Sequence, residues 1–430
     1  ADRADRADRA DQRVRRETLL GKFVLGLACR ACGAAAKLAA FSACPACGGP
    51  LDPVYDWAAI KKSFRKTSLK GRPNTIWRYR ELLPLDMAPT VSLEVGWTPL
   101  IEAPRLAKAM GVRRVWVKCD GQSFPSLSFK DRPVAVAINK ALELGLDTVA
   151  CPSTGNLANA VAAHAAAAGL KAWIFVPHDI EAAKVVATAV YGARMVRVRG
   201  TYDEINRLAR EVADRLKWGV VNVNLRPFYA EGSKTMAYEI AEQREWKTPT
   251  AVVAPMAAGA LLGKLVRGFS ELKQLGWTKG RVPRVYGAQG AACAPIASAV
   301  QSGRIERIAR IERIGTTVAK SLAIGDPVDG PWAAQAILET GGWAESATDA
   351  EVIEGIALLA ETTGLFAETA GGVTVAVARK LARLGRLTKK DDVAVCITGN
   401  GLKTSEALHG ALAEPPVIAP TFQDLEKLLS

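Results

Sequence analysis

The stretch TVACPSTGNLANAVAAHAAAA, residues 148–168, contains in one run the unit from which most of the chain is built. Its first part, 148–152, combines a β-branched pair with apolar residues, which favours a short buried strand. The next four residues, 153–156, are small or polar and are typical of a tight turn. Residues 157–168 are rich in alanine, the strongest helix former. The stretch therefore predicts a strand, a turn and a helix in that order.

The same alternation of β-branched runs and helical stretches continues from residue 113 to near the end of the chain. We expect further strands at 115–118, 172–177, 195–198, 220–223, 251–254, 285–289 and 393–398. A further helix is predicted at 133–146. Because strands that are separated by helices pair in parallel, the pattern predicts an α/β fold with largely parallel sheets.

Four strand-to-helix junctions carry residues suited to binding anions. They read SLSFKDR at 126–132, STGN at 153–156, PMAAGA at 255–260 and TGNG at 398–401. Small residues at a helix start expose backbone N–H groups at its positive end. Since ligands of such folds bind at the carboxyl ends of the strands, the chemistry of this chain is expected at these junctions.

The cysteines are unevenly distributed, because four of the eight lie within the nineteen residues 29–47. Cys29 and Cys32 form one CxxC knuckle, and Cys44 and Cys47 form a second. Four thiolates at this spacing are typical of a closed tetrahedral zinc site, which we expect to be structural because no coordination position stays open. A disulfide pair is the alternative. It fits poorly with the four other cysteines, which are scattered singly as in a reduced cytosolic chain.

The overall composition is that of a globular protein. Of the 430 residues, 49% are hydrophobic and 23% are charged, which excludes a wholly disordered chain. The apolar runs are shorter than the roughly 18 residues that a membrane-spanning helix needs. The 57 basic and 43 acidic residues give a net charge of +14. This surplus fits a nucleic-acid partner, which a zinc ribbon could also bind, or small anionic substrates and cofactors.

Taken in order, the junctions resemble those of the fold-type II pyridoxal-phosphate enzymes, the tryptophan synthase β superfamily. Within it, the segments SFKDR, STGNLANA, YGA, EGSKT and TGNGLK are similar to those of the threonine synthases. The segment GWTPL at 96–100 resembles the family's entry segment, and an N-terminal zinc ribbon is also familiar from threonine and cysteate synthases. The resemblance covers residues 29–412. It implies two parallel-sheet domains that are preceded by a small zinc ribbon.

On this basis we expect the chain to be organised in four parts. They are a charged tail at 1–22 with three ADR repeats, a zinc-ribbon-like module at 23–55, a large domain at 56–129 and 240–430, and a small α/β domain at 130–239. We assign no function to the tail.

The resemblance also implies roles for individual residues. Lys130 would bind the aldehyde of pyridoxal 5'-phosphate covalently and act as the catalytic base. The other cofactor contacts would come from Asn156 beside the ring hydroxyl, from Thr398 at the ring nitrogen, and from the phosphate loop formed by Met256, Ala257, Ala258, Gly259 and Ala260. Ser153, Thr154 and Gly155 would bind the substrate carboxylate.

Two features depart from the family pattern. The phosphate loop reads AAGA at 257–260 instead of a glycine-rich sequence, so only Gly259 freely adopts a positive φ. Many threonine synthases carry an arginine just before the EGxKT segment, whereas here Arg226 lies further upstream, before Pro227. We expect Arg226 and Lys184, which is early in a predicted helix, to bind an anionic group of the substrate.

The reaction implied by the resemblance is that of a lyase of threonine biosynthesis, which converts O-phospho-L-homoserine and water to L-threonine and phosphate. The expected cofactors are pyridoxal 5'-phosphate and a structural Zn²⁺, in a cytoplasmic homodimer that binds neither membrane nor nucleic acid. A cysteate synthase-like or other phosphoamino-acid β-replacement enzyme is the nearest alternative. A zinc-ribbon nucleic-acid-binding protein is the alternative from another class.

Overall fold

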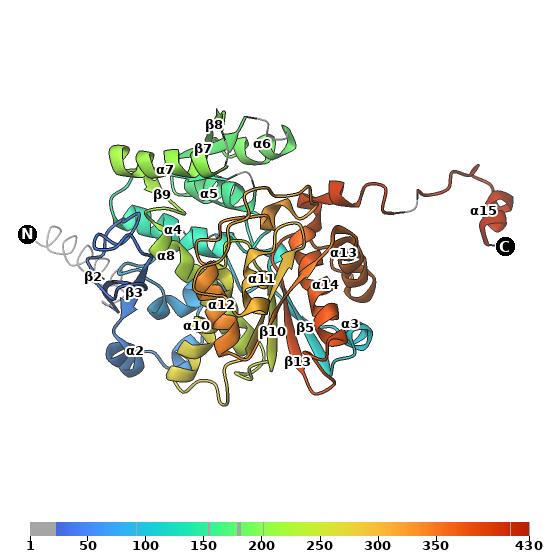
Figure 1. Cartoon of the computed structure of the whole chain (residues 1–430), viewed down its shortest axis with the longest axis horizontal. Helices are drawn as coiled ribbons and strands as arrows, with labels where there is room; N and C mark the ends of the chain where they lie inside the picture. Colours follow the sequence, from blue (N-terminus) through green and yellow to red (C-terminus); the bar gives the residue numbers. More distant parts are fainter. Residues whose placement is uncertain are drawn as a thin grey trace, which may run out of the picture.

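The computed structural model describes residues 23–91, 93–153, 155–178, 182–200, 202–412 and 414–429. The predicted charged tail at 1–22 lies outside the described residues. Where the chain is described, helices alternate with strands, and the strands form three sheets. Figure 1 shows the six-stranded sheet in the lower part of the view, the four-stranded sheet with its helices above it, and the three-stranded sheet at one side.

The six-stranded sheet is the centre of the larger part of the fold. Its strands, in spatial order, are β12 (Ala344–Ala347), β11 (Arg284–Gly290), β10 (Ala251–Pro255), β13 (Asp392–Ile397), β5 (Arg114–Cys119) and β4 (Leu100–Glu102). Neighbouring strands pair in parallel except β4, which is antiparallel to β5. Every residue of β10 and β13 is buried. Such strands read as nearly continuous apolar runs because both faces are covered, and this made them predictable.

Helices cover both faces of this sheet. One face packs against α10 (Ala260–Gln274), α11 (Pro295–Ser302) and α12 (Gly330–Glu339), and the other against α3 (Pro104–Met110), α13 (Asp349–Thr363) and α14 (Thr369–Arg383). Each face has its own apolar core, with Val252 of β10 in one and Val253 in the other. Successive strand residues point to opposite faces, so a single strand supplies both cores.

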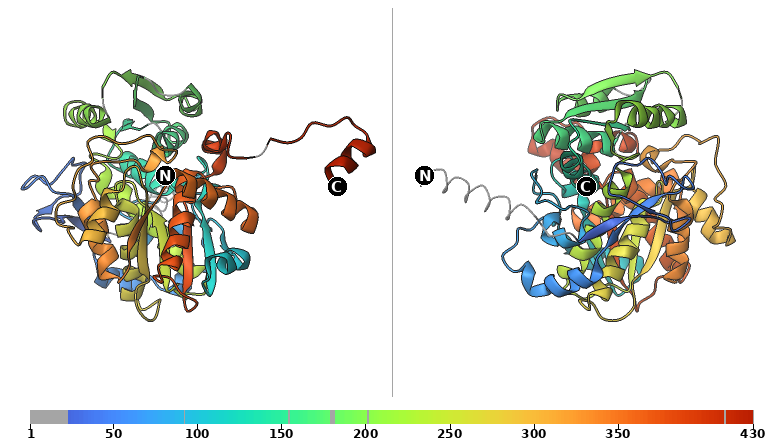
Figure 2. Two further views of the ribbon diagram at one scale, coloured as in Figure 1. Left: turned by 45° about the vertical axis from the view of Figure 1, so that its right-hand side comes forward. Right: turned by 90° about the vertical axis from the view of Figure 1, so that its left-hand side faces the viewer.

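The four-stranded sheet is parallel throughout. Its strands, in spatial order, are β8 (Arg194–Val198), β7 (Lys171–Pro177), β6 (Thr148–Pro152) and β9 (Gly219–Val220). The helices of this region are α4 (Asp131–Glu143), α5 (Asn156–Ala167), α6 (Ala182–Ala189), α7 (Tyr202–Leu216) and α8 (Arg226–Glu231). After them, the 3-10 helix η4 (Gly232–Lys234) leads into α9 (Thr235–Glu242), which packs in the same core as α10 of the larger part. Figure 2 shows from two further sides that this sheet stays stacked above the larger part. The predicted domain boundaries at 130 and 239 stay a prediction.

Two details differ from the sequence pattern. The strand predicted at 220–223 ends at Val220, because the side chain of Asn224 closes a turn there. Asn224 accepts a hydrogen bond from the Val220 N–H at 2.7 Å and donates one to the Trp218 carbonyl at 2.9 Å. The strands β4 and β12 are not predicted by the pattern. They are short, β4 is largely exposed, and β12 reads AESA without a β-branched residue.

Residues 23–55, here called the cysteine module, form the third sheet. Its antiparallel strands are β1 (Val24–Cys29), β2 (Ala35–Ala36) and β3 (Leu51–Tyr55), in the order β2-β1-β3. Leu27 and Leu51 belong to the same apolar cluster as Val134 and Ile138 of α4. The cysteine module therefore packs against the body of the protein through buried hydrophobic side chains.

The segments at the two ends of the body are less regular. After β3 come α2 (Trp57–Ser63) and the 3-10 helices η1 (Lys66–Leu69) and η2 (Ile76–Leu82), as expected for a connecting segment with short helices. The C-terminal helix α15 (Phe422–Leu429) stands apart from the rest of the described chain on an extended segment (Figure 1). None of the helices that the structure describes is both long and apolar enough to cross a membrane.

Candidate active site

Lys130 lies where the segment after β5 meets the end of β13. The N–H of Phe129 donates to the carbonyl of Thr398 at 2.9 Å, and Ser128 pairs with Gly399 in an isolated antiparallel bridge. Because β5 and β13 are parallel neighbours, both junctions open at the same edge of the large sheet. The structure therefore places two predicted cofactor-binding residues, Lys130 and Thr398, side by side.

The Lys130 side chain is half-buried and contacts two aromatic residues. Its Nζ donates to the Tyr229 hydroxyl at 3.1 Å and lies 4.7 Å from the centroid of the Phe129 ring. Lys130 is also the N-cap residue of α4, so its backbone is held by the start of a helix. A neutral hydroxyl and a ring face orient the amine without forming an ion pair with it, which suits a nucleophilic lysine.

A buried ionic network fixes the start of α4 directly behind Lys130. The guanidinium of Arg132 lies 2.6 Å from a carboxylate oxygen of Asp120 and 2.5 Å from one of Glu239, and all three side chains are fully buried. Burial alone would raise the pKa of Glu239, but the charges of Arg132 and Lys118 outweigh it and hold that pKa at about 2. Glu239 is therefore ionised at neutral pH, and its ion pair with Arg132 anchors α4.

Asn156 follows β6 of the four-stranded sheet and is connected through Glu368 to the junction after β13. Its amide donates to both carboxylate oxygens of Glu368, at 3.2 and 2.9 Å, and the Glu368 N–H donates to the Gly399 carbonyl at 3.1 Å. Glu368 thereby connects the junction after β6 with the junction after β13. Burial raises the pKa of its carboxyl, and the Asn156 hydrogen bond and the positive charges of Lys403 and Lys130 oppose that rise.

The proposed substrate-carboxylate segment is partly described. The N–H of Gly155 donates to the Ser153 hydroxyl at 3.4 Å, and Gly155 is the N-cap residue of α5. Thr154 and the Lys184 side chain lie outside the described residues, so the predicted role of each stays a prediction.

The predicted phosphate loop, residues 256–260, follows β10 and begins α10. Gly259 has φ +98°, and a Cβ there would lie 2.9 Å from both the Ala333 Cβ and the Asp329 carbonyl oxygen. The position therefore requires glycine. The Asp329 N–H also donates to the Ala258 carbonyl at 3.0 Å. The loop thus puts the N-terminus of a 15-residue helix at a tight, glycine-dependent turn, as an anion site needs.

Arg226 lies beside this loop. Its guanidinium forms an ion pair with the Asp329 carboxylate. Arg226 is also the first residue of α8, the helix that carries Tyr229, so α8 links the phosphate loop to Lys130. The four predicted junctions therefore belong to one connected site.

Comparison with known proteins agrees with this arrangement. A sequence profile of the family described as "Pyridoxal-phosphate dependent enzyme" matches residues 91–399. The chain is 36% identical over 395 residues to a threonine synthase of Methanosarcina acetivorans, and the matched stretch covers 91% of this chain and 95% of that relative. A threonine synthase of Methanocaldococcus jannaschii is 34% identical over 386 residues, covering 89% and 94%. The chain belongs to the threonine synthase family of pyridoxal-phosphate-dependent enzymes.

Solved structures support the fold of this family. Maize serine racemase superposes with a TM-score of 0.62 at 17% sequence identity, covering 78% of this chain and 94% of the racemase. At that identity the likeness concerns the fold alone. The fold-type II architecture and the family expected from the sequence are both confirmed.

Three residues of the site were not singled out by the sequence. Glu368 is a lone acid before the small residues of ETAGG, and an acid at the start of a glycine-rich helix was the available signal. Lys403 belongs to the quoted TGNGLK motif, and its Nζ donates to the Ser126 carbonyl at 2.5 Å. Tyr229 had no sequence signal, because its contact with Lys130 depends on how α8 packs against α4.

The four clustered cysteines come together in the cysteine module. Their sulfur atoms all lie within 4.8 Å of one another, with Cys29 and Cys47 at 3.5 Å and Cys32 and Cys44 at 3.8 Å. Four thiolates bound tetrahedrally at a Zn–S distance of about 2.3 Å would be about 3.8 Å apart. The sulfur positions therefore fit a zinc ion.

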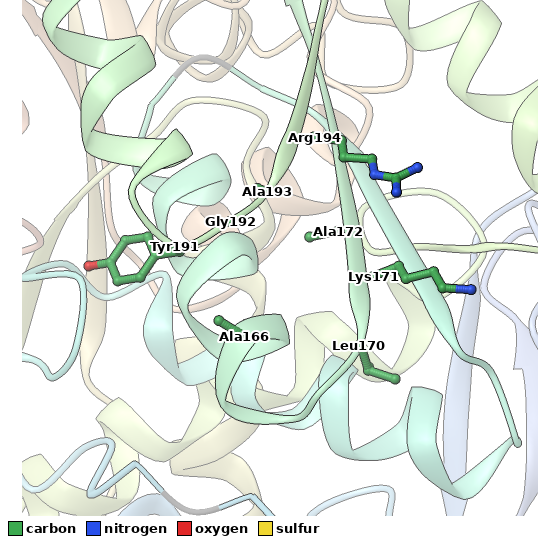
Figure 3. A pocket seen from close by; sticks show the side chains of 8 residues that line it. All are labelled: Ala166, Leu170, Lys171, Ala172, Tyr191, Gly192, Ala193 and Arg194. Carbon is green, nitrogen blue, oxygen red and sulfur yellow. The ribbon is translucent and has the colours of Figure 1, made fainter.

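A separate hollow of about 270 Å³ lies at the opposite end of the four-stranded sheet (Figure 3). It is lined by Ala166, Leu170, Lys171, Ala172, Tyr191, Gly192, Ala193 and Arg194. These residues include the end of α5 and the first residues of β7 and β8, whereas Ser153 follows the carboxyl end of β6. The YGA motif at 191–193 therefore borders this hollow and does not contribute to the candidate active site.

Proposed function

We propose that the chain is a threonine synthase that converts O-phospho-L-homoserine and water to L-threonine and phosphate. The observation that carries the proposal is the 36% identity with a threonine synthase over 91% of this chain and 95% of that relative. The agreement extends over nearly the full length of both chains, and the family profile spans residues 91–399. The contact between the Lys130 and Thr398 segments adds geometric support.

The residues present fit pyridoxal 5'-phosphate. The amine of Lys130 would hold its aldehyde carbon, and Thr398 would meet its ring nitrogen with a hydroxyl. Asn156 would lie beside the ring hydroxyl. The backbone N–H groups of the phosphate loop at 256–260 would bind its phosphate at the positive end of α10. The space that a Cβ at Gly259 would occupy is already filled by Ala333 and Asp329, so the loop requires glycine at this position.

When bound, the cofactor withdraws electrons from the substrate carbons and makes loss of their protons possible. The chain supplies the groups that move those protons. Lys130 Nζ would take the proton from Cα and then one from Cβ, after which phosphate leaves Cγ. One of these protons would be returned to Cγ, which becomes the methyl group. Water would then add its hydroxyl to Cβ, its other proton would go to the released phosphate, and Lys130 would return the second proton to Cα. The Tyr229 hydroxyl, 3.1 Å from that Nζ, would orient the amine between these steps.

Substrate binding would use the residues around this centre. Ser153, Thr154 and Gly155 would bind the substrate carboxylate through hydroxyl and backbone donors. Arg226 and Lys184 would bind the substrate phosphate, and the ion pair with Asp329 sets the position from which Arg226 would reach it. Glu368 would hold Asn156 in place through its two hydrogen bonds.

We further propose that Cys29, Cys32, Cys44 and Cys47 bind a structural Zn²⁺. The close approach of the four sulfurs supports this assignment, and four thiolates leave no coordination position for a substrate. The other four cysteines are buried and form no disulfide, as in a chain kept reduced, which supports a cytoplasmic location. A homodimer is proposed from the family alone.

The test is phosphate release from O-phospho-L-homoserine by the purified chain, with L-threonine identified as the second product. Lys130→Ala should remove turnover and the visible absorbance of the bound cofactor together, whereas Lys171→Ala, at the distant hollow, should change neither. Release of phosphate from O-phosphoserine with sulfite, and not from phosphohomoserine, would replace the proposal with a cysteate synthase-like reaction. Full turnover by Lys130→Ala would contradict the assignment of the catalytic lysine.

A further inference from the structure

The side chain of Arg30 leaves the cysteine module and reaches the body of the protein. Arg30 lies between Cys29 and Cys32 in the first knuckle. Its guanidinium lies 3.0 Å from Asp329 Oδ1 and 3.3 Å from Asp52 Oδ2. The same group lies 4.9 Å from the centroid of the Trp332 ring. Two carboxylates and one aromatic ring thus hold a side chain that originates between two proposed metal ligands.

Asp329 is the residue through which this contact reaches the phosphate loop. Its N–H donates to the Ala258 carbonyl at 3.0 Å, and its carbonyl oxygen would lie 2.9 Å from a Cβ at Gly259. A shift of Asp329 would therefore move the backbone on which the phosphate loop depends. The link from Arg30 to Ala258 passes through a single residue.

The charges around Asp329 also connect Arg30 with the phosphate loop. The Asp329 side chain is only 4% exposed, and its carboxylate lies beside a loop proposed to bind a phosphate. An unpaired carboxylate there would repel the ligand. Arg30 and Arg226 each form an ion pair with Asp329, and Arg30 is also shared with Asp52. Removing Arg30 would leave Arg226 as the partner of Asp329 and reduce the positive charge near the loop.

We propose that Arg30 is a positioning residue for the cofactor-phosphate loop, and that it couples occupancy of the four-cysteine site to cofactor affinity. The inference rests on the proposed function, in which the four cysteines bind Zn²⁺ and residues 256–260 bind the cofactor phosphate. An ion held by Cys29 and Cys32 fixes the backbone on either side of Arg30. Loss of that ion frees the knuckle and with it the geometry of the contact with Asp329.

The test measures how tightly the full-length, cofactor-free protein binds pyridoxal 5'-phosphate, by titration followed through visible absorbance. Arg30→Gln should weaken binding about fivefold, the effect of losing one partly buried ion pair. Arg30→Lys, which keeps the charge, should recover part of the loss. Ser42→Ala is the matched control, because Ser42 also links the cysteine module to the body, through Asp214 at 3.2 Å, but on α7 and away from the loop. It should bind the cofactor like the wild type.

The coupling is tested by removing zinc with a chelator, with metal content measured beside cofactor affinity. Zinc removal should weaken cofactor binding by the wild type to about the level of Arg30→Gln and should weaken Arg30→Gln no further. In a protein that already carries Asp329→Asn, adding Arg30→Gln should likewise cause no further loss of affinity for pyridoxal 5'-phosphate. Unchanged binding by Arg30→Gln, or equal further losses on zinc removal in both proteins, would overturn the inference. A wild type that binds zinc but no pyridoxal phosphate would contradict the proposed function, and the inference with it.

Discussion

The amide of Asn156 donates to both carboxylate oxygens of Glu368, at 3.2 and 2.9 Å, and so joins the four-stranded sheet to the six-stranded one. Asn156 begins α5, and Glu368 precedes α14. The Glu368 backbone contacts Gly399, next to Thr398, so one buried carboxyl connects two junctions of the candidate site. Its titration and its contacts can be tested separately.

Glu368→Gln should change how stability depends on pH. Burial raises the pKa of the Glu368 carboxyl, so the folded chain disfavours its ionised form more than the unfolded chain does. The ordinary pKa of a glutamate carboxyl is 4.5. As the pH rises above this value, the free energy of unfolding of the wild type should therefore fall relative to that of the variant. The amide oxygen introduced by the substitution would still accept from Asn156. Urea unfolding of both cofactor-free proteins over a pH series measures this, and parallel curves would contradict the buried titration.

Tyr229→Phe should slow turnover without unfolding the protein. The variant loses only the hydroxyl that accepts from Lys130 Nζ at 3.1 Å, and the buried ring stays in place. A hydrogen bond between uncharged groups contributes about 0.5–1.5 kcal/mol, so kcat should fall by roughly two- to tenfold. Steady-state kinetics should show little change in KM, and thermal unfolding should be close to that of the wild type. A fall in stability with unchanged kcat would show that the hydroxyl is structural.

Glu239→Gln should strongly destabilise the fold at neutral pH. Arg132 and Lys118 lose a fully buried carboxylate partner, and breaking such a pair costs about 3–5 kcal/mol. Because the folded-state pKa of Glu239 is about 2 against an ordinary 4.5, its contribution is present above pH 4.5 and is lost as the pH falls toward 2. The free energy of unfolding should therefore be measured for both proteins at pH 7 and at pH 3. The difference between wild type and variant should be smaller at pH 3. The exposed Glu245→Gln, whose partner is Lys247, is the control and should cost less than about 1 kcal/mol.

Gly259→Ala should weaken cofactor binding, whereas Gly263→Ala should not. A Cβ at Gly259 would meet Ala333 and Asp329 at 2.9 Å on a backbone with φ +98°, so the phosphate loop must shift. A Cβ at Gly263, in the same helix α10, meets no atom within 4 Å. We expect the first variant to lose about tenfold or more in affinity for pyridoxal phosphate. The second should gain about 0.5–1 kcal/mol of stability from helix propensity. Equal cofactor binding by both variants would argue against this loop as the phosphate site.

In the two larger sheets the sequence predicted the strands that carry β-branched or continuous apolar runs and missed the short strands β4 and β12. β10 and β13 are continuous apolar runs that only a covered parallel strand tolerates, so their positions could be read directly. β12, with the residues AESA, owes its strand conformation to pairing with β11. Local composition cannot reveal a strand that long-range pairing stabilises.

The cysteine spacing, the lysine at a helix start and the small-residue turns were determined by the sequence alone. Each is a local pattern, because the chemistry of a metal knuckle or a helix N-terminus is encoded within a few residues. The contacts of Lys130 with Tyr229, of Asn156 with Glu368, and of Arg30 with Asp329 were decided only by the tertiary structure. Their partners come from separate helices and loops, and only the packing of the two large sheets and the cysteine module brings these side chains within hydrogen-bond distance.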